Sequence, residues 1–185
     1  MFAKPNDPAN FSLQLQRSTD VTLLCYVFER HEIASITPGS GISTIVFKSA
    51  HNLTTNDSAR IIIPPTDPYN GILQGRWTAT KINATTITIP VVAVQAVSNS
   101  GTGGKCTDIS AWTLTPRCIF PDGTTINPTP TITDGTYGEW KEVFTRTQTG
   151  DAPDAVATNE LFALDGAGQQ RKQWLGNLTF AGAKL

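Results

Sequence analysis

Residues 76–89, RWTATKINATTITI, contain two β-prone runs on either side of a turn. The first run, 76–82, alternates between two faces with the period of two that is typical of a half-buried strand. Asn83-Ala84 predicts a tight turn, and residues 86–89 predict the returning strand. Similar short runs with turn signals precede and follow this hairpin, so the spacing predicts a β-meander.

The composition supports the same fold class for the whole chain. Among its 185 residues are 27 threonines, 15 glycines and 12 prolines. Threonine is β-branched and suits a half-exposed strand, whereas glycine and proline favour turns and end helices. We therefore expect an all-β fold, a β-sandwich or β-barrel with Thr-rich short strands and extended N- and C-terminal arms.

The charge is low and balanced, with 14 Lys plus Arg against 15 Asp plus Glu. The chain has no excess of basic residues that would indicate a nucleic-acid partner. Its apolar runs are far shorter than the roughly 20 residues of a membrane span. Charged residues make up 16% of the chain, against about 25% in an ordinary soluble domain. A low charge is typical of surfaces that neighbouring subunits cover.

The pattern along the chain suggests four segments. Residues 1–37 are an N-terminal arm with the first strands, and 38–94 are a barrel-like module. Residues 95–148 are expected to add strands to the same domain. Residues 149–185, rich in Ala, Gly and Gln, predict an extended arm with short helical turns near 159–164 and 169–174. Residues 21–28 are mostly apolar and predict a strand buried on both faces.

A pattern in residues 42–91 resembles a known family. The matching residues are 43–47, 51–57, 59–63, 70–71, 75–80 and 82–89. Together they resemble the small β-barrel repeat of bacteriophage tail and fibre proteins, which is similar to the first catalytic-cysteine half-domain of ubiquitin-activating enzymes. Asn52 and Asn56 replace two glycines of the usual pattern, and both can adopt left-handed angles. A Pro-rich insertion occupies 64–69, and 42–91 contain no cysteine, so ubiquitin-like activation is not expected.

Four residues of this module are expected to shape turns. The Asp57 carboxylate can accept backbone N–H bonds, and Asn70-Gly71 is a turn signal. His51 is expected to pack over a strand end and to donate a hydrogen bond to a carbonyl. Catalysis by His51 is not expected, because the motif supplies no partner base.

No catalytic or metal-binding motif stands out. Cys25, Cys106 and Cys118 lack the paired spacing of zinc ligands, and they are expected to be reduced thiols in a chain made in the cytosol. A Cys106–Cys118 pair across a hairpin is the alternative. Residues 103–107, GGKCT, lack the earlier glycine of a phosphate loop and the Ser or Thr directly after its lysine. We expect no cofactor and no metal.

Four tryptophans, at 77, 112, 140 and 174, allow two interpretations. The first is that they anchor cores and interfaces. The second is that two or three of them form a flat platform on which sugars stack. The sequence does not show whether the rings are coplanar.

The resemblance and the composition together predict a non-enzymatic bacteriophage virion protein, made in the host cytoplasm. We expect it to assemble in multiple copies as a tail, neck or fibre-attachment component, with copies of itself and other virion proteins as partners. The alternatives are a capsid decoration protein and a carbohydrate-binding module for host attachment. The residues expected at interfaces are Phe2, Pro5, Phe11, Phe162, Trp174, Leu175, Phe180 and Leu185.

Overall fold

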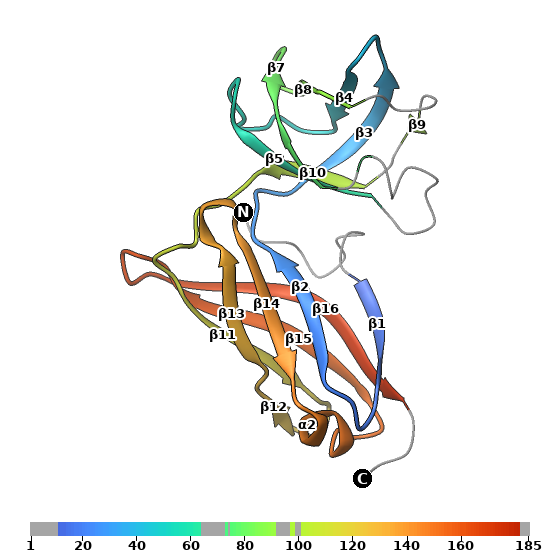
Figure 1. Cartoon of the computed structure of the whole chain (residues 1–185), viewed down its shortest axis with the longest axis vertical. Coiled ribbons are helices and arrows are strands. Elements are labelled where there is room, and N and C mark those ends of the chain that lie inside the picture. The colour runs from blue at the N-terminus through green and yellow to red at the C-terminus, as the bar shows by residue number, and fades with distance from the viewer. Residues whose placement is uncertain (1–10, 64–72, 74, 92–96, 99–100, 182–185) are drawn as a thin grey trace. The chain divides into compact units, whose positions relative to one another are not determined.

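The structure is a computed structural model that describes residues 11–63, 73, 75–91, 97–98 and 101–181. Its regular elements are almost all strands (Figure 1), which confirms the expected all-β fold. The described helices are short and none could span a membrane.

The chain divides into two compact units. Among the described residues, the barrel unit comprises those within 28–107, and the sandwich unit comprises 11–27 together with 108–181. The barrel unit is therefore inserted into the chain of the sandwich unit. The boundaries differ from the expected segments, because a strand on each side of the 38–94 module pairs within the barrel.

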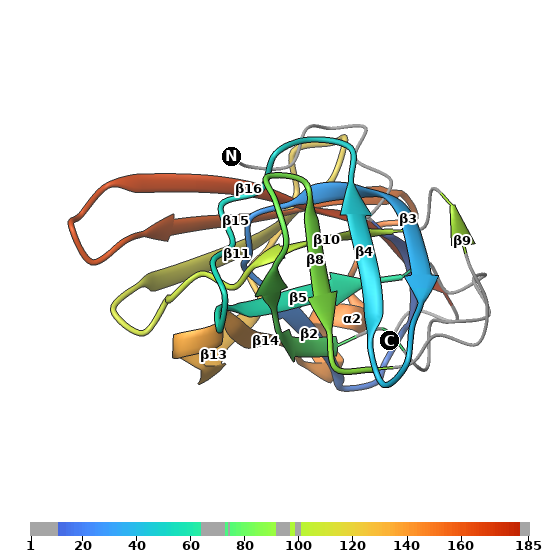
Figure 2. The same cartoon turned by 90° about the horizontal axis from the view of Figure 1, so that it is seen from above.

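The strands of the barrel unit form an eight-stranded, nearly closed sheet. The strand order is β6-β5-β10-β3-β4-β8-β7, and β9 pairs with β3. The first and last strands of this order, β6 and β7, are separated in the chain only by Ala79. Figure 2 shows β3, β4 and β8 side by side. The bounds are β3 His31–Pro38, β4 Ser43–Phe47, β5 Ser58–Ile62, β6 Gly75–Thr78, β7 Thr80–Lys81, β8 Thr86–Ile89, β9 Val97–Ser98 and β10 Thr102–Lys105.

The expected strand over 76–82 is broken into β6 and β7 at Ala79. The buried Ala79 donates its N–H to the Asp57 carbonyl at 2.9 Å and accepts from the Asn56 N–H at 2.8 Å. These bonds hold Ala79 to the residues just before β5, and β7 beyond it pairs with β8, so the two ends of the sheet come together. The returning strand and the turn at Asn83 are confirmed, with the Asn83 side chain accepting from the Thr85 N–H at 2.8 Å.

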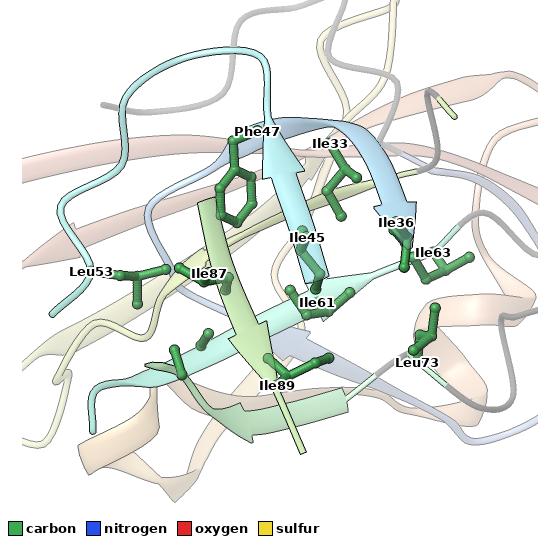
Figure 3. Packing of buried hydrophobic residues seen from close by; sticks show 12 residues of the cluster. Ile33, Ile36, Ile45, Phe47, Leu53, Ile61, Ile63, Leu73, Ile87 and Ile89 are labelled. Carbon is green, nitrogen blue, oxygen red and sulfur yellow. The ribbon is translucent and has the colours of Figure 1, made fainter. Parts of the chain in front are cut away.

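The barrel core is built mainly from isoleucine. Ile45 on β4, Ile61 on β5 and Ile87 on β8 are each fully buried and point toward one another (Figure 3). On β4 and β8 the core positions alternate with half-exposed ones, so a period of two sets which of their residues face the core. On β5 the alternation fails, because Ala59, Arg60 and Ile61 are all buried.

The sandwich unit has two sheets packed face to face. The five-stranded sheet has the order β1-β16-β15-β11-β12, and the three-stranded sheet has the order β13-β14-β2. Inward residues of both sheets share two core clusters. The bounds are β1 Phe11–Gln16, β2 Val21–Tyr26, β11 Thr113–Ile119, β12 Thr125–Ile126, β13 Thr129–Asp134, η1 Gly135–Tyr137, β14 Glu139–Phe144, α2 Arg146–Gly150, β15 Val156–Leu164 and β16 Gln170–Ala181.

The prediction of an extended C-terminal arm over residues 149–185 is wrong for most of that segment. Residues 156–164 and 170–181 are β15 and β16, which lie inside the five-stranded sheet. The helical turns expected near 159–164 and 169–174 are also wrong, because both segments are strand. β15 pairs with β11 and β16 pairs in parallel with β1, so both strands depend on partners far away in the sequence.

The strand predicted at 21–28 is buried on one face only. Its regular part is β2, in which Val21, Leu23 and Cys25 pack into the core clusters. Leu24 points the other way and has 65% of its surface exposed. β2 has β14 as its neighbour on one side and no described strand on the other, so it is an edge strand and not a central one.

Candidate functional site

The turn at residues 54–57 has the predicted carboxylate geometry. Asp57 Oδ2 accepts from the Thr54 N–H at 2.7 Å and the Thr54 hydroxyl at 2.8 Å, and lies 3.1 Å from Lys105 Nζ. Burial alone would raise the pKa of the Asp57 carboxyl, but these contacts outweigh it and lower the pKa. Asn56 has a left-handed φ of 75°, as expected, whereas Asn52 does not.

His51 is part of the same scaffold. Its side chain is 4% exposed and meets the Phe47 ring edge-on, with 5.3 Å between centroids. Nδ1 accepts from the Leu53 N–H at 3.2 Å, so this nitrogen carries no proton. Burial lowers the pKa of His51. The ring thus braces the start of the turn, while Asn70 and Gly71 lie outside the described residues.

The expected interface residues do not form one site. Phe2, Pro5 and Leu185 lie outside the described residues. Phe11 lies on β1, and Trp174 and Leu175 lie on β16, and of these three residues only the backbone is described.

Phe180 is a core residue instead of an interface anchor. It is 4% exposed, and its ring lies 5.9 Å from that of Phe120 and 6.1 Å from that of Phe144. The β16 strand turns this side chain toward the three-stranded sheet, so it is not available to another subunit.

Phe162 is the expected interface residue that stays partly accessible. The guanidinium of Arg117 and the ammonium of Lys172 each lie 5.0 Å from the centre of its ring. Lys172 also pairs with Glu160 at 2.9 Å. The outer face of β11, β15 and β16 therefore carries a mixed aromatic and charged cluster.

The described tryptophans do not form an exposed platform. Trp140 is 1% exposed in the sandwich core, and Trp77 packs against the barrel core while donating to the Leu73 carbonyl at 2.8 Å. Trp112 is half-buried against the sandwich core. These three positions support the interpretation of tryptophans as packing anchors.

None of the three cysteines is in a disulfide, so the Cys106–Cys118 pair is not formed. Cys25 and Cys118 are buried in the sandwich unit and Cys106 is half-buried in the barrel unit. Burial and then the Glu142 carboxyl raise the thiol pKa of both Cys25 and Cys118.

We expect Cys106 to react with a thiol reagent in the native protein, and Cys25 and Cys118 to react only after unfolding. A buried thiol of raised pKa offers little thiolate for the reaction. Mass spectrometry of peptides labelled with and without urea measures this. Native labelling of Cys118 at the rate of Cys106 would contradict the described packing.

The described residues contain no cluster of histidine, cysteine and acidic side chains that could hold a metal ion. An open hollow of about 530 Å³ lies between β12 and α2. Its walls are mostly Thr, Asn and Gln, with Asp151 as the only titratable residue. This chemistry offers hydrogen bonds but no pairing of a nucleophile with a base.

The feature that sequence reasoning missed is the pair of sheet edges at β1 and β2, which no other described strand covers. β1 ends the five-stranded sheet and β2 ends the three-stranded sheet, and the two strands are joined by residues 17–20. We call this the β1–β2 side (Figure 1). The sequence does contain an indication of such edges, because the strand sequences FSLQLQ and VTLLCY contain neither a charged residue nor proline.

No family model matches the chain, and no curated protein matches it either.

Proposed function

We propose that this chain is a non-enzymatic structural protein of a bacteriophage virion that assembles in multiple copies as a tail, neck or fibre-attachment component. The β1–β2 side is the observation that carries the proposal. The resemblance of residues 42–91 to phage tail and fibre modules supports it further, since these residues belong to a nearly closed barrel.

Edge strands present unpaired backbone groups, and monomeric proteins protect them with charges, proline, bulges or short length. The other two edges of the sandwich have such protection, since β12 has two residues and β13 contains Pro130. β1 and β2 have six residues each and neither charge nor proline. Two long unprotected edges on one side are typical of a surface that another chain covers.

The register of β2 shows which backbone groups are available. Val27 N–H donates to the Gly138 carbonyl, so the odd-numbered residues of β2 direct their N–H and C=O groups toward β14. Thr22 and Leu24 direct theirs to the open side. A strand added there gains main-chain hydrogen bonds and covers the exposed Leu24 side chain. We infer that a second copy of this chain supplies that strand.

We expect Leu24→Lys to weaken self-association of the full chain at least tenfold, because a charge on an edge strand opposes pairing. The fold should be unaffected, since Leu24 is 65% exposed. Light scattering over a concentration series measures the association. Ile82→Lys is the matched control, since it places the same charge at a 59% exposed position of the barrel. Association that is equally strong in Leu24→Lys and wild type would contradict the proposed edge.

A further inference from the structure

The three-stranded sheet of the sandwich contains an acidic residue in a row of aromatic core residues. On β14, Trp140, Glu142 and Phe144 share the inward face, and their exposed fractions are 1%, 0% and 0%. The outward residues of the strand are half-exposed. Side chains along β14 alternate between the core and the surface, and Glu142 therefore occupies a core position.

Glu142 belongs to a polar cluster that links the two sheets. Its Oε1 accepts from Asn159 Nδ2 on β15 at 2.7 Å and from Cys25 Sγ on β2 at 3.4 Å. Cys118 Sγ on β11 donates to Asn159 Oδ1 at 3.5 Å. These contacts leave the second carboxyl oxygen, Oε2, buried and without a hydrogen-bond partner.

No cation balances this carboxyl among the described residues that face it. The titratable groups directed at it are the thiols of Cys25 and Cys118, while Asn159 is neutral. Arg17 is the one basic residue among the described residues buried in the sandwich, and its guanidinium bonds to backbone carbonyls and to Asp154. An ionised carboxylate without a cation is costly to bury.

We propose that Glu142 carries a proton on Oε2 in the folded sandwich, and that this neutral acid is a pH-sensitive lock between the two sheets. Loss of the proton to solvent leaves a charge between Trp140 and Phe144. The sandwich then opens more readily along the seam between β14 and β15.

The sign of the pH dependence follows from the burial of the carboxyl. Burial raises the pKa of Glu142, and the bonds from Asn159 and Cys25 only partly oppose this. An unfolded chain releases the same proton near its ordinary pKa of about 4.3. Stability is therefore greatest below that pH and falls as the pH rises through the folded pKa, by up to about tenfold in the folding equilibrium for each pH unit. Above the folded pKa it becomes constant.

The two buried thiols, Cys25 and Cys118, also lower the folding stability as the pH rises, but they do so at higher pH than Glu142. Their unfolded pKa is about 8.5, so they add nothing to the slope below about pH 7.5. Between about pH 4.5 and 7.5 the slope in the sandwich unit is therefore assigned to Glu142, because the two histidines whose pKa burial lowers, His31 and His51, lie in the barrel unit.

Amide hydrogen exchange of β14 and β15 in the full chain tests the lock, with rates corrected for the intrinsic effect of pH. We expect wild-type protection to fall as the pH rises from about 4.5 to 7.5. Glu142→Gln keeps the Oε1 acceptor and removes the ionisation, so its protection should be flat and should exceed wild type at pH 7.5. Glu139→Gln, a half-exposed position on the same strand, should follow wild type. The same pH slope in Glu142→Gln as in wild type would overturn the proposal.

A second measurement on the wild-type chain covers the case in which Glu142→Gln fails to fold. The ¹³C carboxyl resonance of Glu142 reports its protonation directly. We expect this resonance to titrate at a pH clearly above the ordinary pKa of about 4.3. A resonance that titrates near pH 4.3 would overturn the proposal.

Discussion

Arg17→Met is expected to destabilise the sandwich unit by about 3–5 kcal/mol, because the backbone carbonyls that the buried guanidinium serves lose their donor. The Arg17 side chain is fully buried and donates to the carbonyls of Phe180, Gly150, Ala152 and Pro153. It also pairs with Asp154 at 2.5 Å. Methionine fills much of the volume but leaves several buried carbonyls without a donor, each costing about 1–3 kcal/mol.

The position of Arg17 explains why the effect is large. It follows β1 directly, and its own N–H continues the parallel pairing with the Ala181 carbonyl at 2.6 Å. The guanidinium then joins the end of β16 to the segment 150–154. One side chain thus fastens the end of β1 to two segments that each lie more than 130 residues after it in the sequence.

Urea unfolding measured by circular dichroism tests this expectation. Arg146→Met is the matched control, because Arg146 is exposed at the start of α2 and should change stability by less than about 0.5 kcal/mol. Asp154→Asn should also have a small effect, since the Asp154 side chain is 77% exposed. Equal midpoints for Arg17→Met and Arg146→Met would contradict the described network.

Gly104→Ala is expected to destabilise the barrel unit by about 3 kcal/mol, the upper end of the cost of overpacking. A Cβ at Gly104 would lie 1.8 Å from the Glu29 carbonyl oxygen and 3.2 Å from His31 Cδ2. The contact is with backbone, which a rotamer change cannot relieve. Glu29 N–H also bonds to the Lys105 carbonyl at 2.9 Å, so β10 must move away from residue 29 for the methyl group to fit.

Gly39→Ala is the matched control in the same unit. Its Cβ would meet only the flexible Ile42 side chain, at 3.3 Å, and the Ile42 carbonyl at 3.5 Å. We expect it to change stability by less than about 1 kcal/mol. Thermal unfolding of both variants measures the difference. A Gly104→Ala chain as stable as Gly39→Ala would contradict the close approach of β10 to residue 29.

Local signals predicted the barrel unit well. The turn at Asp57, the left-handed Asn56 and the hairpin at Asn83 all depend on contacts within a few residues, and the structure has each of them. The break at Ala79 was not predictable, because it depends on bonds to residues 56 and 57 across the sheet.

The sandwich unit was harder to predict because its pairings are distant. β16 pairs with β1 across more than 160 residues, and its Ala-, Gly- and Gln-rich surroundings give no local indication of that partner. Glu142 illustrates a different difficulty. Its spacing from Trp140 and Phe144 was visible, but a carboxyl in such a row is ordinarily assigned to the surface, and only the structure shows that the row faces inward.

Assembly in multiple copies is the central claim, and the mass of the full-length wild-type chain in solution tests it most directly. Light scattering behind a size-exclusion column, over a wide range of concentration, gives that mass without a partner or a label. We expect a mass that is a whole multiple of 19.9 kDa and greater than one chain. A compact particle of one chain at every concentration would contradict self-assembly through the β1–β2 side.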